Sequence, residues 1–163
     1  MLISIIEAIG DKDKYLVKMI SSVEKMIFID SYTVILKARA ISERIIRNIF
    51  VSEGIVETSD MNQKERIILL QEQRIFSEEI AKMFHTLRFF GNRAIHDELE
   101  GAFETSLMVY RLLFRVLCWY VVVYVKDDFV CGDYVEPDVI GRINDADGKL
   151  SEAINLVMGK AYV

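Results

Sequence analysis

The sequence is poor in the residues that break or end secondary structure. Its 163 residues include only one proline and eight glycines. Sheet-rich folds need turn residues every few positions, so this scarcity favours a few long helices over strands and hairpins. With 52% hydrophobic and 28% charged residues, the chain does not have the composition of a disordered protein. Its length fits one domain, and we expect a single helical domain over residues 1–163.

Cysteine and histidine are also scarce. The two cysteines, Cys118 and Cys131, are too few for a disulfide scaffold or a zinc ribbon. Cys118 falls in an apolar segment and Cys131 in an acidic one, so neither has the cationic surroundings of a reactive thiol. Two histidines cannot build a three-histidine metal centre, and the aspartates of segment 127–133 are more typical of a solvated loop. We therefore predict no metal and no cofactor.

Acidic residues outnumber basic ones, giving a formal net charge of −5 at pH 7. Dedicated nucleic-acid-binding proteins are usually basic, so RNA binding would require a local basic patch. The N-terminal segment lacks a basic region and a small-residue cleavage pattern, which argues against a signal peptide. Arg111 and Arg115 interrupt the apolar stretch 107–125, and the uninterrupted part is about half of the ~20 residues that a membrane span needs. We expect a cytoplasmic protein with no membrane segment.

Apolar residues recur at three- and four-residue intervals along most of the chain, the pattern of amphipathic helices. After a short apolar stretch at 2–9, the expected helices cover about 11–29, 31–53, 61–72, 77–97 and 103–126. The predicted N-caps are Asp11 or Asp13, Asp30 or Ser31, Asp60 (with Gln63 in capping-box spacing) and Ser77. Residues 127–163 form a peripheral acidic loop and a last helix near 146–158. The pattern predicts an all-α, mostly antiparallel bundle of about six helices.

The segment 85–97 carries the most informative polar pattern. At about 100° per residue, four of its polar residues share a helix face about 80° wide: His85, Arg88, Asn92 and His96. Arg93 falls elsewhere on the helix. Gly91 costs about 1 kcal/mol relative to alanine, which predicts either a close contact with another helix or a kink.

This polar face has two interpretations. Buried and fully paired, it would join helices through hydrogen bonds, and His96→Ala would destabilise the fold. Alternatively, Arg88 stabilises the phosphorane of a cleaved RNA, His96 acts as general acid or base, and Asn92 orients them. No glycine-rich phosphate loop is present, so a standard nucleotide site is not indicated.

An earlier pair, Arg39 and Glu43, lies four residues apart on one helix face. It is either an ordinary ion pair or a pair that orients Arg88 or His96. The local positive field for RNA would come from Arg39, Arg44, Arg47 and Arg93. The candidate binding residues are Arg39, Glu43, His85 and Arg93.

The strings KARAISE at 37–43 and LRFFGNRAIH at 87–96 resemble the family known as domain of unknown function 4145. Its hallmark is an Arg-x-x-Gly-Asn-x-x-x-His string preceded by a helix with an Ala-Arg and Glu pattern. The matching residues are Arg88, Gly91, Asn92 and His96, and upstream Ala38, Arg39 and Glu43. Ser42 stands where the family usually has leucine. The resemblance covers about residues 32–125.

The resemblance implies an all-helical prokaryotic domain similar to the HEPN superfamily (higher eukaryotes and prokaryotes nucleotide-binding). Such domains commonly dimerise and occur alone or attached to restriction enzymes and other defence proteins, and the active ones are RNases. Their catalytic Arg and His are separated by four to six residues, whereas seven lie between Arg88 and His96. We therefore predict a non-catalytic interaction and dimerisation module of a defence system, with a metal-independent RNA endonuclease as the alternative.

The apolar character of the helix expected over 103–126 bears on dimerisation. A helix that is apolar nearly all round is buried on several sides. One apolar stripe consists of Met108, Leu112, Val116, Trp119 and Val123, and further apolar or aromatic residues cover much of the remaining surface: Tyr110, Leu113, Phe114, Leu117 and Tyr120. The rest of its surface meets either the N-terminal helices or a second copy of the chain.

Overall fold

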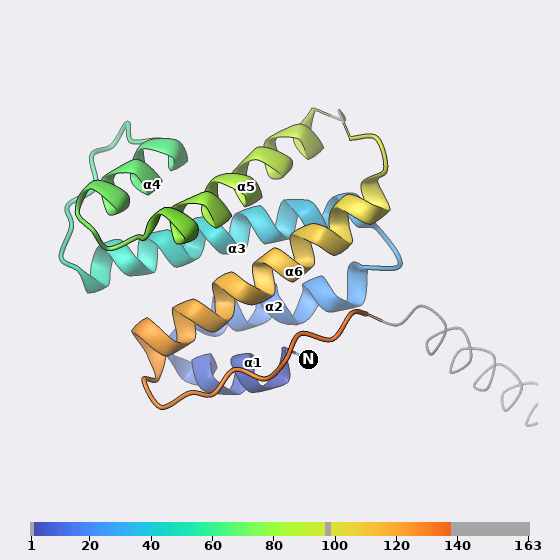
Figure 1. The fold of residues 1–163 in the computed structure, drawn as a ribbon, viewed down its shortest axis with the longest axis horizontal. Coiled ribbons are helices and arrows are strands. Elements are labelled where there is room, and N and C mark those ends of the chain that lie inside the picture. Colours follow the sequence, from blue (N-terminus) through green and yellow to red (C-terminus); the bar gives the residue numbers. More distant parts are fainter. Residues whose placement is uncertain (1, 97–98, 138–163) are drawn as a thin grey trace, which may run out of the picture.

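A computed structural model describes residues 2–96 and 99–137, and every regular element within them is a helix (Figure 1). The predicted all-α class is thus confirmed for the described part of the chain. The helix predicted near 146–158 lies outside it. The helices in chain order are α1 (Ile3–Ile9), η1 (a 3₁₀ turn, Gly10–Asp13), α2 (Lys14–Met26), α3 (Ser31–Ser52), α4 (Gln63–Glu72), α5 (Glu78–Ile95), α6 (Ala102–Tyr120) and η2 (a π-helical turn, Val121–Val125).

Side-chain caps fix most of the helix starts. The carboxylates of Asp13 and Asp30 accept hydrogen bonds from backbone N–H groups at the start of α2 and α3, and the Ser77 hydroxyl does the same for α5. These three caps were predicted. The capping box of α4 lies two residues later than expected, at Asn62 and Glu65. Its spacing is the one predicted, but the chain enters α4 only at residue 63, so the cap falls on Asn62.

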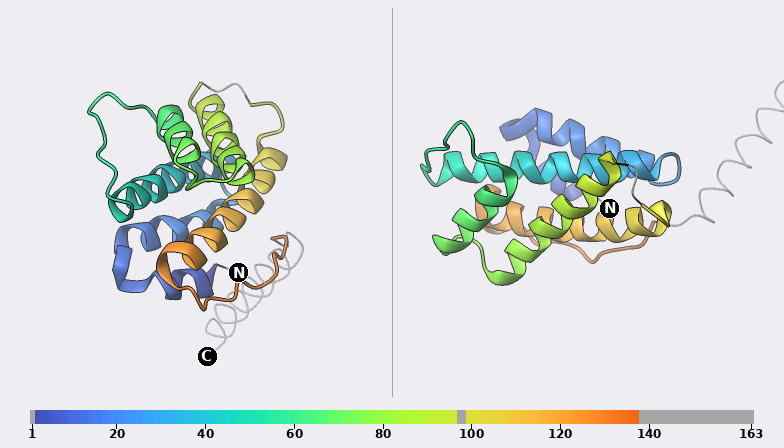
Figure 2. Two further views of the ribbon diagram at one scale, coloured as in Figure 1. Left: turned by 60° about the vertical axis from the view of Figure 1, so that its left-hand side comes forward. Right: turned by 90° about the horizontal axis from the view of Figure 1, so that it is seen from above.

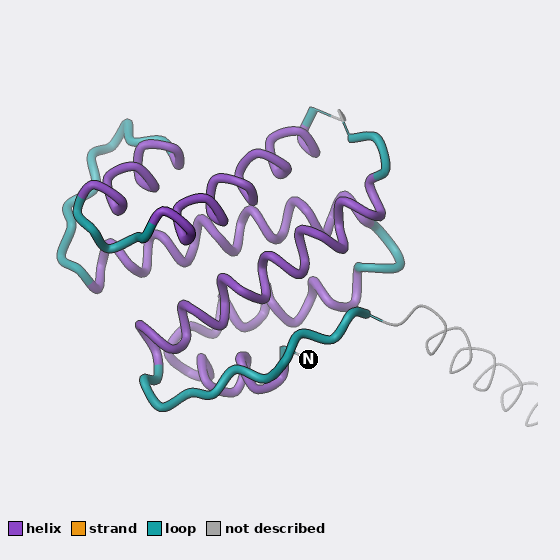
Figure 3. Tube along the Cα trace, in the orientation of Figure 1, coloured by secondary structure: helices purple, strands orange, loops and turns teal. Residues whose placement is uncertain are grey.

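The long helix α3 lies at the centre of the packing. It contacts α2, α5 and α6, and Figures 1 and 3 show helices adjacent in sequence running in opposite directions. The predicted α3 stripe is fully buried: Val34, Ala38, Ile41, Ile45 and Ile49. Burial of a side chain the size of isoleucine stabilises a fold by roughly 1.5–3 kcal/mol, so this stripe anchors the other helices.

α6 is buried on several sides, as its apolar character predicted: Val109, Leu113, Val116 and Leu117 are fully buried. The apolar stripe named from the sequence is divided between core and surface, because Val116 is buried whereas Met108 is 44% exposed and Val123 is 54% exposed. The low polarity of this helix all round leaves its sequence without a single preferred buried face. Within Ala102–Val125, α6 and η2 together have the length and apolar character of a membrane span, and half of the most apolar window is buried in the structure.

After η2 the chain turns back and runs along α6, as Figure 2 also shows. The Lys12 ammonium donates a hydrogen bond to the Val125 carbonyl oxygen at 2.6 Å. Cys118 of α6 and Cys131 of the returning segment are joined in a disulfide, with Cα atoms 5.7 Å apart. The sequence analysis did not predict a bond between these two cysteines. Chain reversal brings them together, and it also places Tyr134 against aromatic side chains of α6.

Candidate functional site

The packing of α5 on α3 depends on Gly91. A Cβ atom built on this glycine would lie 2.5 Å from Cδ and 2.6 Å from Cβ of Arg39. The stem of the Arg39 side chain therefore occupies the space that any larger residue would need. The close helix–helix contact predicted for Gly91 is confirmed.

Arg39 and Glu43 pair with each other within α3. Their Nε and Oε1 atoms are 2.9 Å apart, and each side chain is 25% exposed. The guanidinium is thus held beside its own helix, with its stem under Gly91. This geometry is that of a structural ion pair at the α3–α5 contact.

The four residues of the predicted polar face of α5 occupy different environments. His85, Arg88 and Asn92 are partly buried, whereas His96 is exposed. α5 ends at Ile95, so His96 is the C-cap of the helix rather than part of its face. The expectation that His96 is a buried hydrogen-bond partner is therefore wrong. A rise of 1.5 Å per residue places Arg88 and His96 about 12 Å apart along the helix axis.

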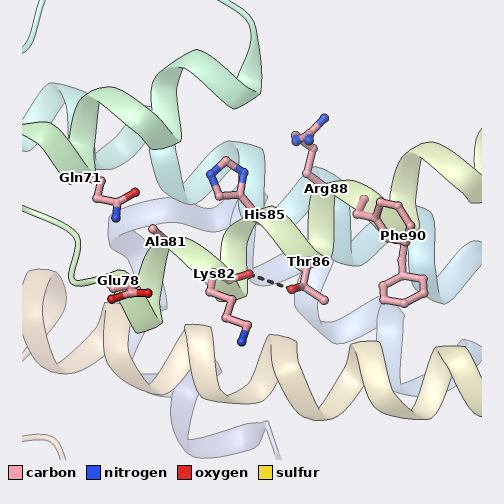
Figure 4. A pocket seen from close by; sticks show the side chains of 9 residues that line it. Gln71, Glu78, Ala81, Lys82, His85, Thr86, Arg88 and Phe90 are labelled. Carbon is pink, nitrogen blue, oxygen red and sulfur yellow. Dashed lines mark hydrogen bonds between the residues drawn. The ribbon is translucent and has the colours of Figure 1, made fainter.

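The structure instead groups His85 with Arg88. An open cleft of about 720 Å³ lies over the outer face of α5, beside the end of α4 (Figure 4). Its lining residues are Gln71, Glu78, Ala81, Lys82, His85, Thr86, Arg88, Phe89 and Phe90. His85 and Arg88 project from the same side of α5 in Figure 4. Asn92, Arg93 and His96 are not among the lining residues.

The cleft has a local excess of positive charge in an acidic protein. Lys82 and Arg88 are permanent cations, and Glu78 is the single carboxylate among the lining residues. Burial lowers the pKa of His85 below its ordinary value of 6.5, and the positive charges of Arg88 and Lys64 lower it further. His85 is therefore neutral near pH 7 and gains a proton only in more acidic solution.

Arg88 has unused hydrogen-bonding capacity. Its Nε atom is buried, and no hydrogen-bond partner for it exists among residues 2–96 and 99–137. A buried donor without a partner costs about 1–3 kcal/mol. Arg88 also lines the cleft, and a guanidinium is suited to binding an anion through its several N–H donors.

Aromatic side chains border the same cleft. Phe89 is 50% exposed and packs edge-on against Phe90, with ring centroids 5.1 Å apart. The Arg93 guanidinium carbon lies 5.8 Å from the centroid of the Phe89 ring. An exposed aromatic ring beside cations is the combination that single-stranded nucleic acids use for base stacking and phosphate contacts.

A second polar cluster, which the sequence did not reveal, joins α2, α3 and α6. Asp13 Oδ2 accepts hydrogen bonds from Arg44 Nε at 2.8 Å and Asn48 Nδ2 at 2.9 Å. Asn48 also donates to the Tyr120 hydroxyl at 3.1 Å. Burial alone would raise the pKa of Asp13, but hydrogen bonds from Arg44, Asn48 and the Leu16 backbone lower it below its ordinary value.

This cluster corrects the role expected for Arg44, which pairs with Asp13 rather than supplying a free positive field. The four-residue spacing of Arg44 and Asn48 beside the apolar stripe of α3 was the only local signal of this cluster.

Among the described residues, no group of three or more His, Cys, Asp or Glu side chains is placed to hold a metal ion.

Comparison of the chain with protein-family models, curated proteins and solved structures finds no match. The resemblance to the domain of unknown function 4145 family therefore rests on the motif residues of α3 and α5.

Proposed function

We propose that this chain is a non-catalytic, HEPN-like helical module that binds single-stranded RNA in the cleft between α4 and α5. The observation that carries the proposal is that Arg88, whose Nε has no partner in the described part of the chain, lines the same open cleft as His85, Lys82 and the half-exposed Phe89. A guanidinium is a planar fork of donors that matches the oxygens of a phosphate group.

RNA suits this cleft better than a small anion does. The cleft is open and elongated along α5, and the half-exposed ring of Phe89 offers a surface for an unstacked base. The net charge of −5 opposes general attraction to nucleic acid. Binding then depends on the few cations of the cleft, which predicts modest affinity and strong dependence on salt.

The geometry favours binding over cleavage. An RNase centre built on Arg88 and His96 requires both side chains to reach one phosphate. The two residues are about 12 Å apart along the α5 axis, and His96 lies at the exposed C-cap outside the cleft lining. The proposal includes a homodimer and a protein partner in a defence system, which the motif resemblance supports.

The test measures binding of a fluorescently labelled single-stranded RNA at low salt by fluorescence anisotropy. Arg88→Ala is expected to weaken binding at least tenfold, because a charge-assisted hydrogen bond is worth about 1.5–3 kcal/mol. It should also reduce the slope of log affinity against log salt by about 0.7 per lost phosphate contact. Arg47, which the sequence placed in the positive field for RNA, is exposed on α3 and does not line the cleft, so Arg47→Ala is the matched control that removes the same charge. We expect its affinity to stay within about twofold of the parent.

Three results would contradict the proposal. The first is an absence of RNA binding by the folded parent protein, and the second is an equal loss of affinity in Arg88→Ala and Arg47→Ala. The third is metal-free cleavage of the RNA that disappears in both Arg88→Ala and a folded His96→Ala variant, which would establish the endonuclease alternative instead.

A further inference from the structure

A covalent bond ties the segment that returns along α6 to that helix. Cys118 of α6 and Cys131 of the returning segment form a disulfide, with Cα atoms 5.7 Å apart, a separation typical of such bonds. The chain has two cysteines, so an intramolecular disulfide in this protein can join no other pair. The bond links positions that are 13 residues apart in the sequence and fixes the path of the chain after η2.

The same segment also contacts α6 through charged side chains. Residues 127–137 contain no helix or strand, so the segment does not extend a regular element of the fold. Glu136 Oε2 lies 2.9 Å from Arg111 Nη2, and the two side chains are 49% and 61% exposed. An ion pair this exposed contributes little to stability, so it holds the segment far less firmly than a covalent bond does.

The segment covers an aromatic face of α6. The Tyr134 ring packs against those of Tyr110 and Phe114, with centroids 6.3 Å and 5.5 Å away. Tyr110 is fully buried and Phe114 is 7% exposed. Movement of the segment away from α6 would take the Tyr134 ring off both side chains, and this face of the helix would become accessible to solvent.

Small solutes can approach the disulfide. Cys118 and Cys131 are both only partly buried, and the neighbours of Cys131, Val130 and Gly132, are exposed. Thiol–disulfide exchange requires access of the attacking thiolate to a sulfur atom, and exposed disulfides are more labile than those enclosed in a core. This bond therefore has the surroundings of a reversible disulfide.

We propose that Cys118–Cys131 is a reversible thiol–disulfide site that exchanges with a low-molecular-weight thiol and its disulfide. Its redox state sets whether segment 127–137 covers the aromatic face of α6. In reduction, the thiolate of one small thiol attacks a sulfur of the bond, which releases one cysteine thiolate and leaves a mixed disulfide on the other. A second small thiol attacks the mixed disulfide. The protein gains two electrons and two protons, and the two small thiols leave as one disulfide; oxidation is the reverse.

The test compares the folded full chain in oxidised and reduced glutathione. Alkylation of free thiols followed by mass spectrometry should find none in the oxidised protein and two in the reduced one. Hydrogen exchange of the amides in 129–136 should be at least about tenfold faster after reduction, because loss of a cross-link over a short loop removes more than a factor of ten in chain restriction. The amides of α3 should not change.

Two variants separate the bond from general effects of the buffer. Cys131→Ser should show the fast exchange in both buffers, since it cannot form the bond. The matched control is Val130→Ser, which changes the adjacent residue, 86% exposed, and keeps both cysteines. It should retain the difference between the oxidised and reduced states.

Three results would overturn the proposal. One is a folded protein that forms no disulfide in oxidised glutathione. Another is a disulfide that millimolar reduced glutathione leaves intact in the folded protein, because the bond would then be a permanent structural link. The last is equally slow exchange of 129–136 in Cys131→Ser and the oxidised parent, which would show that noncovalent contacts alone hold the segment. RNA binding by the α4–α5 cleft is measured separately and does not enter these outcomes.

Discussion

His85 is the residue whose charge the fold controls most directly within the cleft. Lys64 from α4 and Arg88 from α5 both act on it, in addition to partial burial. Lys82 and Glu78 complete the charged groups of the cleft lining. Near pH 7 the His85 imidazole is neutral, so it does not repel the neighbouring cations Arg88 and Lys64. Arg88 remains charged and able to bind an anion.

A pH prediction follows for His85. Because its pKa is lowered in the folded protein, the unfolded chain binds more protons once the pH falls below about 6.5. The free energy of unfolding should therefore fall as the pH is lowered from 7.5 to 5.5, and His85→Gln should reduce this fall. Urea unfolding at both pH values measures it. An NMR titration that finds the His85 pKa above 6.5 without RNA would contradict the prediction.

The contact between α3 and α5 is the critical one at the scale of elements. Gly91 lets α5 approach the stem of Arg39 on α3, and the Arg39–Glu43 ion pair holds that stem in place. The same contact sets the orientation of α5, and therefore where His85 and Arg88 project. The motif residues of the two helices act together here as packing residues.

Gly91→Ala should destabilise the protein even though alanine favours helices by about 1 kcal/mol over glycine. The added Cβ would lie 2.6 Å from Arg39 Cβ, an atom that cannot move without moving α3. Overpacking of this kind costs about 1–3 kcal/mol and sometimes more, so after the gain from helix propensity we expect a net loss of up to about 2 kcal/mol in the free energy of unfolding, measured by urea unfolding.

Gly132→Ala is the control for this substitution, because a Cβ there meets nothing within 4 Å. Its stability should stay within about 0.5 kcal/mol of the parent. A Gly91→Ala variant as stable as the parent would show that the two helices have room to separate.

At the scale of the whole molecule, an apolar patch lies at the outer junction of α3 and α5. Leu36 is 37% exposed and Ile95 is 57% exposed, and both line a small hollow with Arg39, Ala40 and Glu43. This patch adjoins the residues that carry the family resemblance. It is the surface where we expect the second copy of the predicted homodimer to bind.

Light scattering tests the dimer. The parent chain should be dimeric at tens of micromolar, and Ile95→Asp should shift it towards monomer because a desolvated carboxylate at an interface is costly. Val56→Asp is the matched control, since Val56 is 86% exposed and lies in the loop before α4. A monomeric parent at these concentrations would contradict the prediction.

The sequence predicted the parts of the candidate site that depend on residues close together in the chain, and it did not predict the parts that depend on distant ones. The helical spacing of His85 and Arg88 places them on one face, and the structure keeps them together. The same spacing placed His96 on this face with Arg88. The helix ends at Ile95, however, so His96 no longer has helical geometry and does not share the face. The excess of positive charge around His85 involves Lys64, twenty-one positions earlier in the sequence, which no local pattern relates to it.

Local sequence patterns predict helices α2 to α6, three of their caps, the buried stripe of α3 and the close contact at Gly91, whereas they identify residues 2–9 only as an apolar stretch and not as the helix α1. All of these depend on interactions between residues three or four apart, or on the absence of a side chain. Long-range packing sets the exposed positions of α6, the pairing of Arg44 with Asp13, the Cys118–Cys131 link and the position of the cleft. Each of these depends on segments distant in sequence. An apolar helix has no unique inward face until its neighbours are in place.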